Sequence, residues 1–326
     1  ADSLRFGLAH LTTETQDVRM PVQFECPSCN ALVEQTRKNR EKSRIECDKC
    51  NQPFRTQWAR SEDDLALPRG AVVSERFELA RNFCNKLWNA SRLVLLNLDG
   101  YQSAPVKDEQ LEFEDRWILS RLTSTTRIVT DALEKYQFAD AARTLYDFAW
   151  DDFCSSYLEM VKARLQDPER RGVAQRVVAF ALDQLLRLLH PMIPFITEEV
   201  WDLLGKIAPE RGLSDPQVPE DLLIASSWPE ANESLHNPQV EERFQKYSSV
   251  LRALREIRSR QNIVDKTPIT FLVQCDQASA ELLEPMLPFF QSLTNANSAG
   301  LGEQVTPPKT HARVQLAEME VYVDLA

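Results

Sequence analysis

Four cysteines in two closely spaced pairs constrain the fold of this chain more than any other feature. Cys26 and Cys29 form the first pair, Cys47 and Cys50 the second, in the pattern C-x2-C-x17-C-x2-C. This spacing is typical of a zinc site in which two C-x-x-C turns hold one tetrahedral ion. Because all four ligands come from the protein, the zinc is expected to be structural and to supply much of the segment's folding free energy. The pattern leaves open two chance pairs or a redox site.

Outside this segment the sequence predicts mainly helix. Only 8 of the 326 residues are glycine, and apolar residues recur at the three- and four-residue spacing of a helical face. We expect helices at 3–12, from a cap at Ser74 to about Gly100, and at 112–135, 138–165, 172–189 and 194–204. Their lengths and short connections predict an antiparallel helical bundle. A small α/β subdomain follows, with a basic helix at 240–260 and the strand-like segments PITFLVQC, RVQLAEM and VYVDLA.

Two prolines interrupt the helical pattern in LLHPMIPFITEEVW, residues 188–201. Pro191 lacks an amide hydrogen and disfavours helix at His190, whereas Pro194 suits the first turn of a new helix. We therefore interpret the stretch as a joint between two helices. His190 is expected to be structural rather than catalytic.

The net charge of −11 argues against a general polyanion-binding protein, but the charge is uneven. Segments 35–44 and 246–260 are both strongly basic and can meet a phosphate backbone locally, although a solvated surface is the alternative for each. No apolar run approaches the roughly 18 residues of a membrane span. The N-terminus lacks the features of a signal peptide, and the cysteine usage favours a reducing cytoplasm.

No set of residues predicts a catalytic centre, because the histidines are scattered and Asp151 and Asp152 lack a base or nucleophile nearby. The helix after Ser74 instead carries a polar face around Trp88, consisting of Arg76, Arg81, Asn82, Asn85, Lys86, Asn89 and Arg92. Arginine and lysine suit phosphates, and asparagine can pair with the edges of unstacked bases. An exposed bundle surface is the alternative, although asparagine is a poor helix former.

ARNFCNKLWNASR at 80–92 and LLHPMIPFITEEVW at 188–201 resemble the valyl-tRNA synthetase family of class I aminoacyl-tRNA synthetases. The same family is resembled, in the same order, by ADSLRF at the N-terminus, TQDVRM at 15–20, DDFCSSYLEMVKARL at 151–165 and LREIRSRQNI at 254–263. The resemblance implies a C-terminal part of such an enzyme, whose anticodon-binding bundle binds tRNA(Val). It implies tRNA contacts at Arg76, Arg81, Asn82, Lys86, Asn89, Arg92 and the position of Leu93.

The same resemblance implies that the chemistry lies outside these residues. The HIGH and KMSKS signatures do not occur in the sequence, so valine activation with ATP and Mg²⁺ and the editing of misacylated product would belong to other domains. We expect the fragment to bind tRNA without charging it. We also expect it to be a monomer that packs on the catalytic domain of the full-length enzyme.

Two departures from the family pattern matter. Many members pass from the TQDVRM-like segment almost directly into the helix after Ser74, whereas about fifty residues with the cysteine motif intervene here. The role of this insertion is therefore not implied by the family; we interpret it as a rigid ribbon whose basic loop, Arg37 to Arg44, reaches toward tRNA or braces the catalytic domain. Leu93 stands where the family generally has a phenylalanine suited to stacking on an anticodon base. We therefore expect tRNA binding to depend mainly on Arg76, Asn82, Lys86 and Asn89.

The predicted domain organisation has four parts: a junction to the catalytic domain at 1–20, the zinc-ribbon insertion at 21–73, the anticodon-binding bundle at 74–239 and the α/β subdomain at 240–326. Two other functions stay open from the residues alone. One is a freestanding zinc-ribbon scaffold that binds protein partners, and the other is the equivalent region of isoleucyl-tRNA synthetase.

Overall fold

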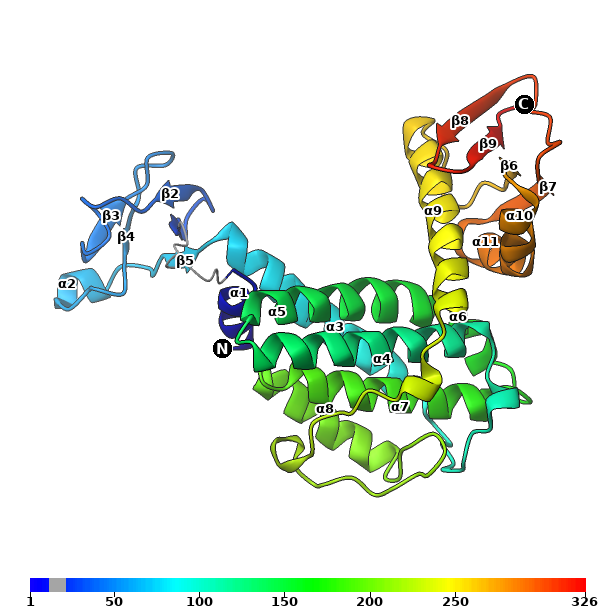
Figure 1. The fold of residues 1–326 in the computed structure, drawn as a ribbon. Coiled ribbons are helices and arrows are strands. Elements are labelled where there is room, and N and C mark those ends of the chain that lie inside the picture. Colours follow the sequence, from blue (N-terminus) through cyan, green and yellow to red (C-terminus); the bar gives the residue numbers. More distant parts are fainter. Residues whose placement is uncertain (12–21) are drawn as a thin grey trace.

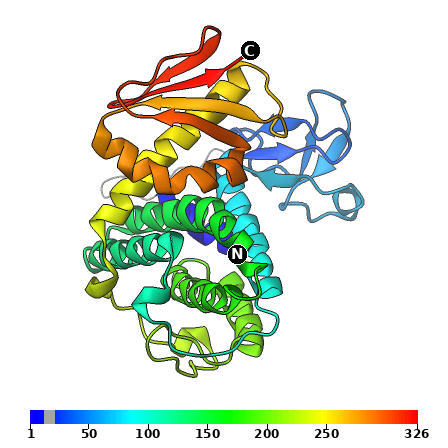
Figure 2. The same cartoon turned by 90° about the vertical axis from the view of Figure 1, so that its right-hand side faces the viewer.

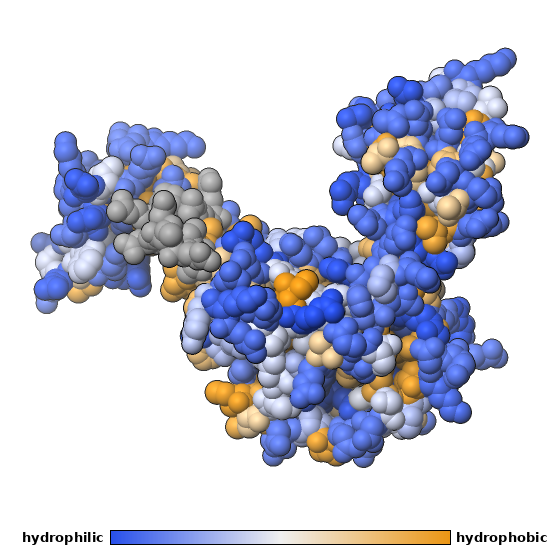
Figure 3. Space-filling view, viewed as in Figure 1, coloured by the Kyte–Doolittle hydropathy of each residue, from blue (hydrophilic) through white to orange (hydrophobic). Residues whose placement is uncertain are grey.

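The computed structural model describes residues 1–11 and 22–326, with the side chains of Glu75 and Arg76 left out. A helical bundle forms the centre, and two smaller units project from the same side of it (Figure 1). In the space-filling view these two units stand clear of each other above the bundle (Figure 3). Each of the three parts has its own hydrophobic core, and the protein is mainly α, as predicted. The TQDVRM segment lies outside the described residues.

The predicted bundle helices are confirmed, except that the helix expected at 138–165 is divided. They are α1 (Asp2–Leu11), α3 (Glu75–Asn97), α4 (Phe113–Glu134), α5 (Phe138–Asp147), α6 (Leu158–Leu165), α7 (Arg171–Leu189) and α8 (Pro194–Ile207). An aromatic stack joins three of them, because Phe6 of α1 lies 4.4 Å from Phe83 of α3, and Phe83 lies 5.3 Å from Tyr146 of α5, between ring centroids. α1 is thereby part of the bundle core.

The predicted single helix at 138–165 differs from expectation in its middle. A π-helical segment, Phe148–Tyr157, joins α5 to α6. Within it, the hydroxyls of Ser155 and Ser156 donate to the carbonyls of Trp150 and Asp151, five residues earlier. The wider π turn is rare and often marks functional positions, and an apolar pattern does not distinguish it from α-helix.

The joint between α7 and α8 is confirmed by the helix bounds, since α7 ends at Leu189 and Pro194 begins α8. The Asp2 carboxylate of α1 accepts hydrogen bonds from the amides of Phe195 (3.3 Å) and Ile196 (2.7 Å), at the positive end of α8. His190 is hydrogen-bonded through Nδ1 to the Thr197 hydroxyl at 2.9 Å, and burial lowers its pKa. These contacts agree with a structural role for His190.

The cysteine-paired unit contains two small antiparallel sheets. One has the order β2-β1-β5, with β1 (Gln23–Glu25), β2 (Leu32–Glu34) and β5 (Ala71–Val73); the other pairs β3 (Arg44–Glu46) with β4 (Pro53–Arg55). A short helix, α2 (Glu62–Leu65), lies between β4 and β5. Gly70 passes so close to Phe54 that a Cβ atom there would lie 2.4 Å from the ring. A side chain at position 70 would therefore collide with the small core, and glycine is required there.

The C-terminal unit is built around α9 (Pro238–Arg260) and a four-stranded sheet (Figure 2). The strand order is β7-β6-β9-β8, with β6 (Ile269–Gln274), β7 (Ala296–Leu301), β8 (His311–Gln315) and β9 (Glu320–Asp324). The helical pieces α10 (Gln277–Leu283) and α11 (Leu287–Thr294) cross between β6 and β7, which are parallel. Ile269, Phe271 and Val273 alternate along β6 and are buried in this core.

α9 connects the C-terminal unit to the bundle. Phe244 of α9 stacks on Trp117 of α4 with ring centroids 3.5 Å apart. The Arg121 guanidinium of α4 contacts Glu241 of α9 at 3.4 Å. Among the described residues, no helix is both long enough and apolar enough to cross a membrane.

Candidate metal centre and nucleic-acid interface

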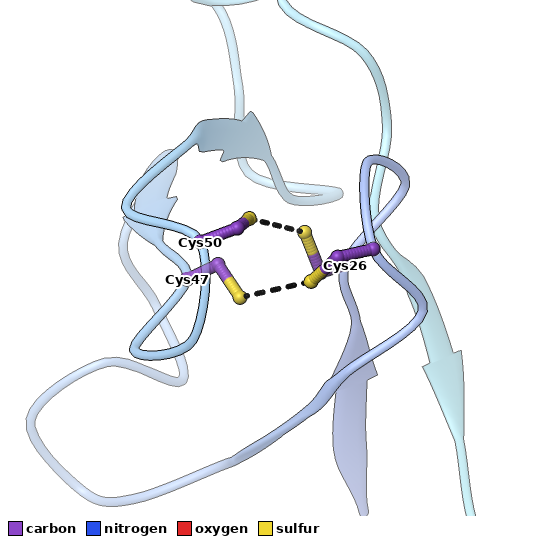
Figure 4. A group of neighbouring side chains, drawn as sticks. Cys26, Cys47 and Cys50 are labelled. Carbon is purple, nitrogen blue, oxygen red and sulfur yellow. Dashed lines mark hydrogen bonds between the residues drawn. The ribbon is translucent and has the colours of Figure 1, made fainter.

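The four predicted cysteine ligands converge. Their sulfur atoms all lie within 4.8 Å of one another, with Cys26 and Cys50 3.7 Å apart and Cys29 and Cys47 3.6 Å apart. Zn–S bonds of about 2.3 Å in a tetrahedron place sulfurs about 3.8 Å apart. Figure 4 shows Cys47 and Cys50 on one turn facing Cys26 on the other. The four thiols therefore fit a single tetrahedral metal ion, and the two predicted pairs form one site.

Each pair belongs to the same local structure. The amide of Asn30 donates to the carbonyl of Cys26 at 2.9 Å, and the amide of Asn51 donates to that of Cys47 at 2.8 Å. Both asparagines have left-handed backbones, with φ values of 56° and 54°. Asparagine tolerates this conformation better than most residues. The repeated sequence C-x-x-C-N thus forms two matching turns that present their thiols to a common centre.

The electrostatics of the cluster favour a cation. Hydrogen bonds from the backbone amides of Cys50 and Lys49 lower the pKa of the Cys47 thiol to about 7. A hydrogen bond from the backbone amide of Gln52 also lowers the pKa of the Cys50 thiol. Burial and the three neighbouring thiols outweigh this effect and raise the pKa of Cys50 to about 12. Thiols this close cannot all ionise without a positive charge among them, which a metal ion provides.

The polar face predicted on α3 is largely exposed. Arg81, Asn82, Asn85, Asn89 and Arg92 all lie on the solvent side, and the Trp88 side chain among them is 39% exposed. Arg81 forms a 3.4 Å ion pair with Glu78. The side chains of the other four form no hydrogen bond or ion pair with any residue that the structure describes. These side chains are available to an external ligand.

Lys86 lies at the edge of this face and has internal contacts. Its ammonium donates to the Ser155 hydroxyl at 2.6 Å and lies 3.9 Å from the centre of the Trp150 ring. Burial lowers its pKa, opposed by Cys154 and Asp151. Leu93 is partly buried against the bundle core. The Arg76 side chain lies outside the described part of the chain.

The two basic segments differ in what their side chains do. Arg37, Lys38, Arg40, Lys42 and Arg44 are all exposed on the ribbon, and of these Arg40 pairs with Glu41 at 3.3 Å. In the second segment three of the five cations are engaged internally. Arg258 donates to backbone carbonyls, including that of Thr294 at 2.6 Å, Lys246 pairs with Glu318, and Arg260 pairs with Glu256.

The remaining two cations of that segment, Arg252 and Arg255, line a cleft of about 570 Å³ where α9 meets the bundle. Asp147, Asp151 and Tyr247 also line this cleft. The basic helix and Asp151 were singled out separately from the sequence, whereas Asp147 was not. Only the tertiary packing of α9 on the π-helical segment brings these residues into one site.

Comparison with known proteins shows what this chain is similar to. Residues 115–274 match the family described as the anticodon-binding domain of tRNA ligase. A valine–tRNA ligase of Rhodopirellula baltica is 52% identical over 99% of this chain. Over nearly its whole length this chain is therefore similar to a valine–tRNA ligase. It spans only 32% of the length of that relative.

Other valine–tRNA ligases match a smaller part of the chain. Those of Thermotoga maritima and Listeria innocua are 38% and 34% identical over 76% and 77% of it, and it covers 26% and 28% of their lengths. The Rhodopirellula match spans nearly the whole chain, and its range therefore includes the ribbon. A LeuRS structure from Agrobacterium radiobacter aligns over 50% of this chain and 17% of its own, with a TM-score of 0.37 and 22% identity.

Proposed function

We propose that this chain is the tRNA-binding part of a valine–tRNA ligase, and that the whole enzyme attaches valine to tRNA(Val) with ATP and Mg²⁺ in the cytoplasm. The observation that carries the proposal is the 52% identity to a valine–tRNA ligase across 99% of the chain, together with the anticodon-binding domain at 115–274. The parts that would activate valine are assigned to residues outside this chain. The fragment is accordingly expected to bind tRNA as a monomer without charging it.

The proposed domain division follows the predicted boundaries. Residues 1–20 form the junction to the catalytic domain, 21–73 the ribbon, 74–239 the anticodon-binding bundle and 240–326 the α/β subdomain. The three separate cores support the last three of these parts, and α1 of the junction packs into the bundle core through Phe6. Zinc is the proposed ion in the ribbon, because four thiolates in a tetrahedron favour it over the hard cations Mg²⁺ and Ca²⁺. The exposed cations of its basic loop are proposed to contact tRNA phosphates or the catalytic domain.

The proposed anticodon contacts are those of the α3 face. Arg81 and Arg92 are assigned to phosphates, and Asn82 and Asn89 to base edges. Lys86 and Leu93 border this face, and Lys86 must give up its contact with Ser155 to reach a phosphate. Arg76 stays in the proposed set as the family resemblance implies.

The combined change Arg81→Ala, Asn89→Ala and Arg92→Ala is expected to weaken tRNA(Val) binding by about 10- to 100-fold. A plot of log affinity against log salt concentration should become shallower, its slope falling by about 0.7–0.9 for each lost phosphate contact. The measurement is an equilibrium titration with a tRNA(Val) transcript at several salt concentrations. Because these side chains are exposed, thermal unfolding should change little.

A matched control removes two exposed arginines elsewhere, Arg260 and Arg313, which pair with Glu256 and Glu320. Equal binding by the α3 variant and this control would show that α3 does not contact tRNA. Failure of the unaltered chain to prefer tRNA(Val) over tRNA(Ile), with a flat salt dependence, would overturn the proposed function itself and favour a protein-binding scaffold.

A further inference from the structure

The cleft between α9 and the bundle contains the buried hydroxyl of Tyr247, for which the described part of the chain offers no hydrogen-bond partner. Tyr247 is only 1% exposed and lines the cleft. Its hydroxyl has no hydrogen-bond partner among the described residues. A buried polar group left unpaired costs free energy, so an unpartnered hydroxyl at a cleft points to a ligand that completes its hydrogen bonding. The cleft's volume of about 570 Å³ lies within the range of small-molecule sites.

Opposite charges line the two sides of this cleft. Arg252 and Arg255 project from α9, and neither forms an ion pair or side-chain hydrogen bond with any residue in the described part of the chain. Across from them, Asp147 and Asp151 lie exposed on the end of α5 and the π-helical segment. Arg121 is engaged, because it binds Asp152 at 2.9 Å and Glu241 at 3.4 Å. The free groups therefore suit a ligand with an anionic part and a hydrogen-bond-donating part.

The π-helical segment contributes polar residues to the cleft. Asp151, Ser155 and Ser156 all come from these ten residues. A π-helical stretch is rare in proteins, and such stretches occur often at functional sites. That this segment lines the same cleft as Arg252 and Arg255 is an observation independent of their charge.

We propose that this cleft binds one unstacked nucleotide of the tRNA, with its phosphate against Arg252 and Arg255 and its base amino group or ribose hydroxyl against Asp151. The Tyr247 hydroxyl donates to the same phosphate. A nucleotide carries both required chemical parts, and unstacked nucleotides are what proteins read in RNA loops. The inference rests on the proposed function. It adds a second contact region on α9 and the π-helical segment, which adjoins the α3 face through the contact of Lys86 with Ser155.

The first test is the double change Arg252→Ala and Arg255→Ala in the 326-residue chain, titrated with a tRNA(Val) transcript. We expect binding to weaken about tenfold or more, with a shallower salt dependence. The control is again Arg260→Ala with Arg313→Ala, which removes the same charge from the same C-terminal unit. Equal affinities for the two double variants would overturn the inference.

Two further variants separate a ligand contact from general charge. Tyr247→Phe removes an unpartnered hydroxyl, so thermal stability should not fall, while tRNA binding should weaken about threefold with an unchanged salt slope. Asp151→Asn removes a negative charge and would tighten binding of a polyanion if the carboxylate only repelled RNA. We expect it to weaken binding instead, because the carboxylate accepts hydrogen bonds from the nucleotide.

The outcomes distinguish this inference from the proposed function. The proposed function stands if the unaltered chain binds tRNA(Val) and the α3 variant loses binding. If, in that case, Tyr247→Phe has no effect and Asp151→Asn tightens binding, the cleft does not hold a nucleotide. If the unaltered chain does not bind tRNA(Val), both fail. Weakening by all three cleft variants supports the site.

Discussion

Replacing Cys47 with alanine is expected to unfold the ribbon and leave the bundle folded. The ribbon core consists of a few residues around Phe24 and Phe54, with two of the four cysteines among its buried members. In zinc-finger peptides, metal binding supplies about 10–16 kcal/mol, which exceeds what so small a core can provide. The bundle has a separate core, to which no ribbon residue contributes among the described residues. Zinc content should fall from one ion per chain to none.

Limited proteolysis and far-UV circular dichroism measure this outcome. Cleavage should appear within 22–73, while the helical signal should change little. A matched control is Cys154→Ala, because Cys154 lies in the π-helical segment away from the cluster. That variant should keep one zinc per chain. A Cys47→Ala chain that resists proteases within the ribbon, or an unaltered chain without bound zinc, would contradict the metal assignment.

Arg164→Ala is expected to destabilise the bundle by about 3–5 kcal/mol. The Arg164 side chain is 3% exposed and contacts two equally buried carboxylates, Glu114 at 2.8 Å and Asp115 at 2.7 Å. Its removal leaves both carboxylates in the core without their cation. Arg170→Ala is the control, because Arg170 pairs with Glu112 at the surface and such pairs contribute about 0–1 kcal/mol. Urea unfolding measures both.

The loss caused by Arg164→Ala should depend on pH. Burial already raises the pKa of Glu114 and of Asp115 above their ordinary values, and Arg164 opposes the rise. Without Arg164 these folded-state pKa values rise further, so the folded state binds protons that the unfolded state releases. The free energy of unfolding of the variant should then fall as pH rises from about 5 to 8. This interval lies above the pKa values of about 4 that the two carboxyls have in the unfolded chain. An equal loss at pH 5 and pH 8 would contradict the assignment.

Features encoded by local pattern were predictable from the sequence. The apolar spacing of α3, α4 and α7 defined their bounds closely, and the two prolines defined the joint before α8. The cysteine spacing defined the cluster because each pair forms its own turn. Alternating apolar residues likewise identified β6.

Features that depend on tertiary packing were not predictable. β7 has the sequence ANSAGL, which has low strand propensity, and it forms because β6 is available beside it. The π-helical segment has an ordinary helical sequence pattern. Lys86 is spaced like a surface cation but lies over Trp150, a residue sixty-four positions later that no periodicity relates to it. The cleft of Arg252 and Arg255 requires α9 to pack on the π-helical segment.

The most direct test of the central claim is the effect of the anticodon on binding. The 326-residue chain is titrated with tRNA(Val), with tRNA(Val) carrying the isoleucine anticodon, and with tRNA(Ile) carrying the valine anticodon, at one fixed salt concentration. We expect affinity to follow the anticodon. The isoleucine anticodon should weaken binding of tRNA(Val) by about tenfold or more, since each lost base contact is worth about 1–3 kcal/mol in discrimination. The valine anticodon should correspondingly strengthen binding of tRNA(Ile). Equal affinity for all of these RNAs would contradict an anticodon-binding role for this chain.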